Sequence, residues 1–176
     1  MFRGMIALNG WNGVRACAAA LATLALAGCG MSDFGSFLFG SSSNLEQLNQ
    51  TEASGNQFQR AQFSDYAFLA RSFGASPAGE EDALAEVYAG KALAAAQGSD
   101  VAPEEARTSD QQEALARLSR ALGAGRRQAP ADAARAQADY DCWIVDQAMP
   151  RSAEQCRGSL DVTLPQLESD VGIAGY

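Results

Sequence analysis

The 176-residue chain contains no histidine, and this absence limits the chemistry that its other residues could perform. Histidine is the commonest general base and the commonest neutral metal ligand. The serines therefore lack the partner of the usual catalytic triad, and a serine–lysine pair would need Lys91, the only lysine. We expect Lys91 to lie on an amphipathic helix and to extend its ammonium group into solvent. These residue types predict no catalytic residue, no metal site and no bound cofactor.

Neighbouring carboxylates are the remaining candidates for acid–base chemistry, because burial can separate the pKa values of such a pair. Asp139 and Asp141 are two residues apart, so they point to different faces of a helix. Glu104 with Glu105 and the acidic run 80–82 lie at expected helix starts or on polar faces. We therefore expect these carboxylates to be solvated and to have structural roles.

Two of the four cysteines could form a disulfide. Cys142 and Cys156 lie on either side of Pro150, and two antiparallel helices joined there would bring them within disulfide distance. The alternatives are a redox pair and a metal site. The spacing is not that of a CxxC motif, and two thiols without histidine make a poor zinc site. The sequence favours a structural disulfide that closes a loop of about 15 residues.

Tyr140 and Trp143 lie about one helical turn apart, on either side of Cys142. If this aromatic pair is exposed, it could anchor a partner protein. If it is buried, it forms the core beneath the disulfide. We favour the core interpretation and keep both residues as possible partner contacts.

Charge and composition exclude two classes of protein. Lys and Arg total 13 against 21 Asp and Glu, which gives a formal net charge of −8 and leaves no basic surface for nucleic acid. Apolar residues make up 47% of the chain, enough for a core, which argues against disorder throughout. The length fits one ordinary domain with a tail.

The first thirty residues predict an export signal. Arg3 and Arg15 occur in a segment without acidic residues, and residues 16–27 form an apolar tract. This tract is too short to cross a bilayer, which needs about 20 residues, but it fits a secretory signal. It ends in Leu26-Ala27-Gly28-Cys29, which resembles the lipobox of bacterial lipoproteins. The resemblance implies removal of residues 1–28 and lipidation of Cys29, which would anchor the chain to a membrane.

The residue after the cysteine bears on the destination of such a lipoprotein. Gly30 stands where an aspartate is the usual signal for retention in the inner membrane of enteric bacteria. The resemblance therefore implies anchoring in the outer membrane, on the periplasmic side, with inner-membrane anchoring as the less favoured alternative.

The spacing of apolar residues predicts an all-α domain over residues 57–168. A lipidated N-terminus with a flexible linker (29–56) precedes it, and a frayed tail (169–176) follows. No segment alternates as a strand does, and alanine, the best helix former, is abundant. We expect a helical-hairpin array or a small bundle of four to five helices. Their expected ranges are about 58–74, 80–97, 109–123, 131–148 and 152–167.

Residues at the ends of these ranges support the assignment. Ser109–Gln112 and Asp110–Glu113 each fit a capping box at the start of the third helix. Gly98 suits the position after the second helix. Gly123 and Gly125 are expected to end the third helix.

One segment has a more specific resemblance. Asp139-Tyr140-Asp141-Cys142-Trp143 resembles the helical N-terminal region of proteobacterial OmpA-family lipoproteins, in which a second cysteine follows about fourteen residues later. The stretch 88–98 resembles the lysine-containing, alanine-rich helix of this family, and the similarity covers about residues 82–167. Members usually continue into a peptidoglycan-binding domain. This chain has no Asn-x-x-Leu-Ser-x-x-Arg segment of that domain, so direct peptidoglycan binding is not supported for any of its residues.

These observations predict a non-enzymatic lipoprotein of the cell envelope. We expect it to act as a structural spacer or as a protein-interaction module with an envelope protein as partner. The alternative is a pilotin-like or adaptor lipoprotein, which would bind a partner segment in a groove between helices. An exposed apolar groove would favour the adaptor.

Overall fold

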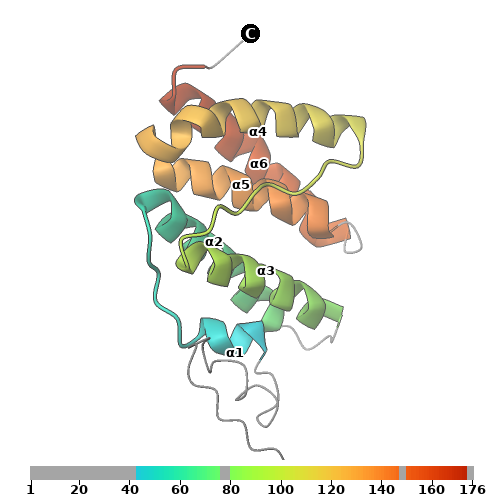
Figure 1. Cartoon of the computed structure of the whole chain (residues 1–176). Helices are drawn as coiled ribbons and strands as arrows, with labels where there is room; N and C mark the ends of the chain where they lie inside the picture. Colours follow the sequence, from blue (N-terminus) through green and yellow to red (C-terminus); the bar gives the residue numbers. More distant parts are fainter. Residues whose placement is uncertain (1–42, 76–79, 147–149, 174–176) are drawn as a thin grey trace, which may run out of the picture. The chain divides into compact units, whose positions relative to one another are not determined.

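The structure is a computed structural model that describes residues 43–75, 80–146 and 150–173 (Figure 1). Within these residues the chain forms six helices and no strand, so the predicted all-α fold is confirmed. The predicted export signal, the lipobox-like segment and Cys29 lie outside the described residues. The helices are α1 (Asn44–Leu48), α2 (Gln57–Gly74), α3 (Glu80–Ala96), α4 (Ser109–Gln128), α5 (Pro130–Val145) and α6 (Pro150–Asp170).

The folded domain begins before residue 57, because α1 is part of it. The Ser43 hydroxyl caps α1 by accepting a backbone hydrogen bond. Leu48 is fully buried, and the backbone N–H of Asn44 donates to the Glu86 carboxylate on α3 at 2.7 Å. The prediction that residues 43–56 belong to a flexible linker is therefore wrong. Their polar composition concealed a helix cap and one buried leucine.

The helices α2 and α3 pack on each other and, together with α1, surround one hydrophobic core. Asn56 and Gln59 form a capping box at the start of α2. Gly98 follows α3 with a φ of 79°, a left-handed conformation that glycine adopts without strain. The position predicted for this glycine is thus confirmed.

Both ends of α4 differ from the prediction. Its capping box is formed by Thr108 and Gln111, one residue before the first predicted box. The helix also continues through Gly123 and Gly125 instead of ending there. Gly125 allows close packing, because a Cβ at this position would lie 2.8 Å from the Leu167 side chain on α6.

The helix α6 is continuous through Pro165, which lies in its interior. It ends in a turn in which Gly172 has a φ of 72° and the Ile173 N–H donates to the Glu168 carbonyl at 2.9 Å. Residues 169–173, which we assigned to a frayed tail, therefore contain the end of this helix and its cap.

The helix α5 lies between α4 and α2 (Figure 1), and it contributes residues to two hydrophobic cores. One core is formed by α1, α2 and α3, with Ala138 from α5. The other is formed by α4, α5 and α6, with Phe58 from α2. Every residue from Ala136 to Ile144 is buried. The central helix therefore presents its polar residues, as well as its apolar ones, to neighbouring parts of the chain.

Candidate functional site

The only lysine lies inside the domain. Lys91 Nζ on α3 is 2.8 Å from Asp141 Oδ2 on α5 and 2.8 Å from Glu104 Oε1 in the connector between α3 and α4. The side chain of Asp141 is fully buried, and that of Lys91 is 14% exposed. The predictions of a solvent-directed lysine and of a solvated Asp141 are therefore wrong. Each charge instead neutralises the other in the interior.

Two further groups bind the Asp141 carboxylate. The Tyr66 hydroxyl of α2 donates to Oδ2 at 2.6 Å, and the backbone N–H of Glu104 donates to Oδ1 at 2.8 Å. Burial raises the pKa of Asp141, while the ammonium group of Lys91 and these hydrogen bonds lower it. Burial also raises the pKa of Tyr66 well above its ordinary value, and the Asp141 carboxylate raises it further. The hydroxyl therefore keeps its proton and remains a donor.

The same cluster holds the connector that follows α3. The side-chain amide of Gln137 on α5 donates to the Tyr66 hydroxyl at 3.2 Å and to the Val101 carbonyl at 2.8 Å. Gln62 donates to the same carbonyl at 3.4 Å. The buried cluster thus ties one extended segment to three helices. Its geometry fits a structural role, because the fully buried Asp141 carboxylate holds the connector against the helices.

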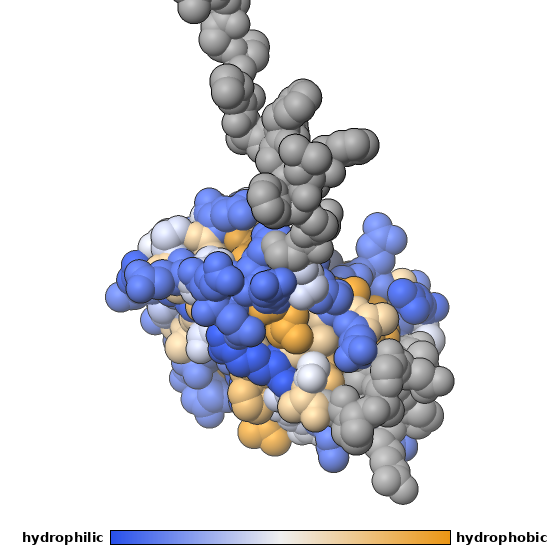
Figure 2. All heavy atoms as spheres, turned by 90° about the horizontal axis from the view of Figure 1, so that it is seen from below, coloured by the Kyte–Doolittle hydropathy of each residue, from blue (hydrophilic) through white to orange (hydrophobic). Residues whose placement is uncertain are grey.

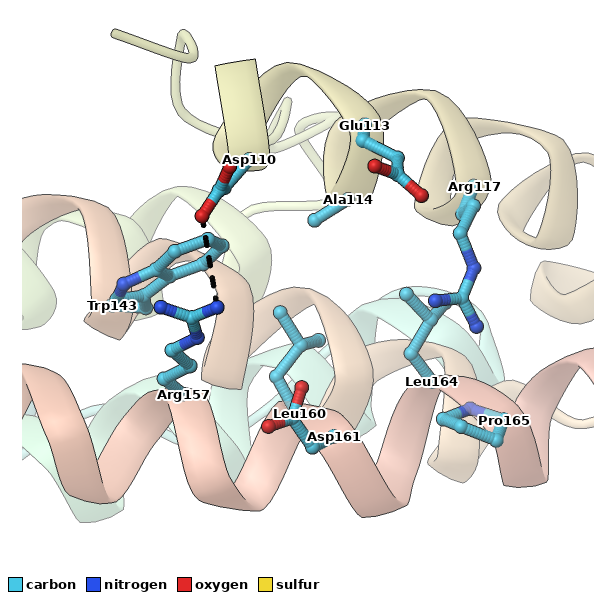
Figure 3. Close-up of a pocket in the computed structure, with 10 residues that line it drawn as sticks. All are labelled: Asp110, Glu113, Ala114, Arg117, Trp143, Arg157, Leu160, Asp161, Leu164 and Pro165. Carbon is cyan, nitrogen blue, oxygen red and sulfur yellow. Dashed lines mark ion pairs between the residues drawn. The ribbon is translucent and has the colours of Figure 1, made fainter. Parts of the chain in front are cut away.

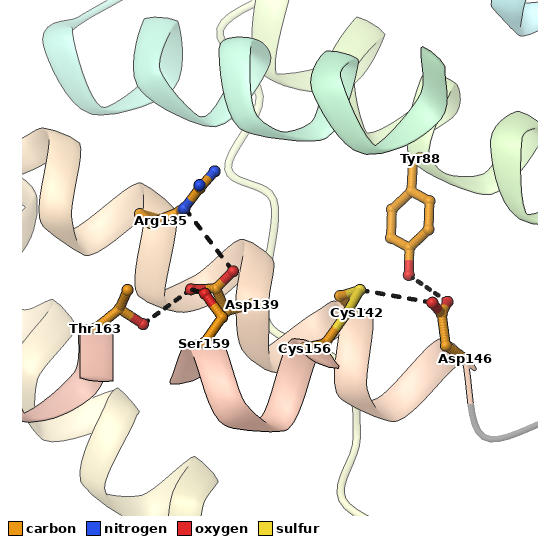
Figure 4. Close-up of a disulfide and its surroundings, with 8 residues drawn as sticks. All are labelled: Tyr88, Arg135, Asp139, Cys142, Asp146, Cys156, Ser159 and Thr163. Carbon is orange, nitrogen blue, oxygen red and sulfur yellow. Dashed lines mark hydrogen bonds and ion pairs between the residues drawn. A yellow bond between two sulfur atoms is a disulfide. The ribbon is translucent and has the colours of Figure 1, made fainter. Parts of the chain in front are cut away.

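The predicted disulfide between Cys142 on α5 and Cys156 on α6 is confirmed (Figure 4). The two Cα atoms are 5.7 Å apart, within the usual range for a disulfide. Asp146 lies one turn after Cys142, and its carboxylate accepts a hydrogen bond from the Tyr88 hydroxyl of α3 at 2.9 Å. Sulfur and carboxylate oxygen atoms of Cys142, Asp146 and Cys156 lie within 4.8 Å of one another. The bonded sulfurs are not thiolates, however, so they do not offer the ligands that zinc requires.

Asp139 lies on a different face of α5 from Asp141, as predicted, but it too is buried. Its Oδ2 accepts hydrogen bonds from the hydroxyls of Ser159 at 2.8 Å and Thr163 at 2.9 Å, both on α6 (Figure 4). Arg135, one turn earlier, is 3.9 Å from its other oxygen. Burial raises the pKa of Asp139, and the two hydroxyls and Arg135 act in the opposite direction. The prediction of a solvated Asp139 is therefore wrong.

The aromatic pair lies in the core formed by α4, α5 and α6. Tyr140 is fully buried, and Trp143 is 9% exposed. Their rings meet edge to face with centroids 6.3 Å apart, and the guanidinium of Arg157 lies over the Trp143 ring at 5.2 Å. Full burial rules out Tyr140 as a direct partner contact in this structure. Trp143 borders a surface groove and stays a candidate contact.

This groove runs between α4 and α6 and has a volume of about 340 Å³ (Figure 3). Trp143, Leu160 and Leu164 form its apolar part. The walls carry charges of both signs, and Asp110 of α4 pairs with Arg157 of α6 across it at 3.7 Å. The sequence did not predict the groove, because its two walls are about fifty residues apart along the chain. Its lining residues are Asp110, Glu113, Ala114, Arg117, Trp143, Arg157, Leu160, Asp161, Leu164 and Pro165.

The rest of the surface is mixed. The face shown in Figure 2 is mainly hydrophilic, with small apolar patches between the polar side chains. Four large apolar side chains are exposed among the described residues, and they are Phe68, Val87, Val162 and Ile173. None of the helices in the described ranges is both long enough and apolar enough to cross a membrane.

Comparison with protein-family models, with curated proteins and with solved structures finds no match to this chain. The resemblance to the helical region of OmpA-family lipoproteins therefore stays a prediction. It depends on the segment around Cys142 and on the alanine-rich helix that contains Lys91.

Proposed function

We propose that the chain is a lipid-anchored protein of the bacterial cell envelope, whose helical domain acts as a non-enzymatic spacer or protein-interaction module. The lipobox-like sequence at residues 26–29 would supply the anchor, and the absence of aspartate after Cys29 favours the outer membrane. The domain would then face the periplasm.

The disulfide between Cys142 and Cys156 is the observation that supports this location most directly. Disulfides persist in oxidising compartments such as the periplasm and are rare in the cytosol. The signal-like N-terminus and the disulfide are far apart in the sequence, and each favours export independently.

The interior charges favour a structural function over catalysis. Lys91, Asp141 and Tyr66 bind one another and hold the connector that contains Glu104. A second surface hollow is lined by residues of α4, by Glu168 and by Ile173. Neither this hollow nor the groove beside Trp143 is lined by Lys91 or Asp141. A domain braced in this way presents its helices in fixed positions, as a spacer or docking module requires.

Substitution of the lipidated cysteine tests the anchor. We expect Cys29→Ser to move the protein from the membrane fraction to the soluble fraction and to abolish labelling with a palmitate analogue. Cys17→Ser is the matched control, because it removes a cysteine of the signal segment that carries no lipid in this proposal. A Cys29→Ser protein that remained labelled and membrane-bound would contradict lipid anchoring.

Substitution of the next residue tests the destination separately. We expect Gly30→Asp to move the intact lipoprotein from outer-membrane to inner-membrane fractions on a density gradient, with Gly30→Ser as the control. If both variants and the original protein share one fraction, residue 30 does not sort this protein.

The groove between α4 and α6 favours the second candidate function, an adaptor that binds a segment of an envelope protein. It combines an apolar floor with charged walls, which suits a peptide or helix of mixed character (Figure 3). A photoreactive residue at Asp161, in the groove, should cross-link a specific protein in intact cells. The same residue at Glu52, which is exposed and outside the groove, is the control. Equal cross-linking from both positions, or none from Asp161, would argue against the adaptor.

A further inference from the structure

The outer face of α4 carries a regular stripe of residues that no described part of the chain covers. Its members recur at alternating spacings of four and three residues, which places them on one face of the helix. All six are exposed, and they are Ser109, Glu113, Ala116, Arg120, Gly123 and Arg127. No hydrogen bond or ion pair joins Glu113 or Arg120 to another residue in the described parts of the chain. Glu113 does act electrostatically on Arg117 of the same helix, whose own ion pair is with Glu168 on α6.

The charges on this stripe are separated along the helix. Glu113 lies in the N-terminal half of α4, and Arg120 and Arg127 lie in the C-terminal half. The helix dipole explains Arg127, which lies in the last turn. It does not explain Glu113 or Arg120, because the effect of the dipole is confined to the terminal turns.

Because of this charge order, the exposed face of α4 is electrostatically complementary to the same face of a second, antiparallel copy. If two copies of α4 pack antiparallel about a two-fold axis beside Ala116, Glu113 of each copy lies opposite Arg120 of the other. Ala116 has a small side chain at the crossing point. A Cβ at Gly123 would meet no atom of the described chain, so packing within the domain does not require a glycine there. Both residues permit close approach of a second helix.

The surface beside the stripe is hollow and partly apolar. A depression of about 720 Å³ separates Ala116 and Arg120 of α4 from Ile173, just after α6. The Ile173 side chain is 39% exposed. A second copy could therefore bury apolar surface as well as pair charges.

We propose that the outer face of α4 is a self-association surface, and that its occupant is a second copy of this chain in an antiparallel, two-fold arrangement. Each dimer would contain two symmetric contacts between Glu113 and Arg120. The proposal does not depend on lipid anchoring, since all the residues that carry it lie in the helical domain.

Charge reversal on the full chain, purified in detergent, tests this pairing. The mass of the protein component is measured by light scattering over a range of concentrations, and circular dichroism checks that each variant folds. The unmodified chain should form dimers. Glu113→Arg or Arg120→Glu alone should weaken dimerisation about tenfold or more, because each places like charges at both contacts. Glu154→Arg, the same reversal at an exposed residue of α6 outside the stripe, should leave dimerisation unchanged.

Mixing the two single variants gives the decisive result. A Glu113→Arg chain paired with an Arg120→Glu chain has opposite charges at both contacts, so an equimolar mixture should form heterodimers about as readily as the unmodified chain dimerises. The double variant Glu113→Arg/Arg120→Glu should also dimerise with itself. An unmodified chain that stays monomeric, single variants that dimerise normally, or a mixture that is not restored would each overturn the proposal.

Discussion

The two sides of α5 are both buried, but they are buried by different means. Toward α2 and α3 the helix presents Gln137, Asp141 and Asp146, whose side chains are fully buried. Toward α4 and α6 it presents mainly apolar side chains, among them Tyr140 and Ile144, together with the disulfide at Cys142. We call these the polar side and the apolar side of α5.

The two sides of α5 therefore contribute differently: the apolar side mainly stabilises the fold, and the polar side mainly specifies how the neighbouring elements are placed. Burial of apolar surface stabilises the apolar side with little dependence on direction. On the polar side, Asp141 must meet Lys91, Tyr66 and the N–H of Glu104 at the same time. These contacts depend on distance and direction, so this side favours a defined position of α2, α3 and the connector against α5.

The largest expected effect comes from removing the cation of the polar side. Lys91→Met would leave the Asp141 carboxylate buried without its counter-charge, and such a change costs about 3–5 kcal/mol. Urea unfolding of the variant and of the unmodified protein measures this loss. The double variant Lys91→Met/Asp141→Leu should be more stable than Lys91→Met alone, because it also removes the buried charge. A loss below about 1 kcal/mol for Lys91→Met would show that Asp141 is not held as an ion pair.

On the apolar side, the corresponding test removes the covalent link. Cys142→Ser/Cys156→Ser should lower the free energy of unfolding by about 3 kcal/mol, the value expected for a loop of this length. Reduction of the unmodified protein should produce the same loss in urea unfolding. Two titratable thiols in unreduced protein isolated from an oxidising compartment would contradict the disulfide.

Removing one tyrosine hydroxyl on each side of α5 compares the two sides by the same chemical change. Tyr66→Phe removes a hydroxyl that donates to Asp141 and accepts from Gln137, so we expect a loss of about 1–3 kcal/mol. Tyr140→Phe removes a buried hydroxyl that has no hydrogen-bond partner among the described residues. Its removal should be neutral or slightly stabilising. Equal losses in thermal or urea unfolding would show that the two sides do not differ in the way described.

The contrast between the polar and the apolar side of α5 also explains which features of the structure could be predicted from the sequence. Apolar spacing predicted α2, α3 and α5 to within a few residues, and the positions of Cys142 and Cys156 around Pro150 predicted the disulfide. Both are local patterns. Gly98 was recognised for the same reason, since a glycine after an alanine-rich helix is a local signal.

The polar side could not be predicted because its partners are distant in the sequence. Lys91 and Asp141 are separated by 50 residues, and each alone resembles a solvated charge on a helix. Gly123 and Gly125 were misassigned for a related reason. A glycine that ends a helix and one that admits a neighbouring helix look alike until the neighbour, here Leu167, is known.

The smallest expected effect concerns Asp139, at the contact between α5 and α6. Burial raises its pKa above the usual 3.8, so the folded chain retains this proton at pH values where the unfolded chain has lost it. Stability from this group is therefore present at low pH and decreases as the pH rises through the raised pKa. Asp139→Asn has no such proton, and its side-chain oxygen can still accept from Ser159 and Thr163.

The stability of the unmodified protein relative to Asp139→Asn should therefore fall as the pH is raised from about 4 to about 7. Urea unfolding of both proteins at each pH measures this difference. Burial also raises the pKa of Asp141, but this residue is present in both proteins and its contribution cancels. Asp65 is coupled to Asp139, whose charge raises the pKa of Asp65, so the substitution changes its contribution in the same direction. A difference that is constant, or that grows with pH, would mean that Ser159, Thr163 and Arg135 outweigh burial. Asp139 would then be an ionised group whose charge is stabilised by its hydrogen bonds and by Arg135.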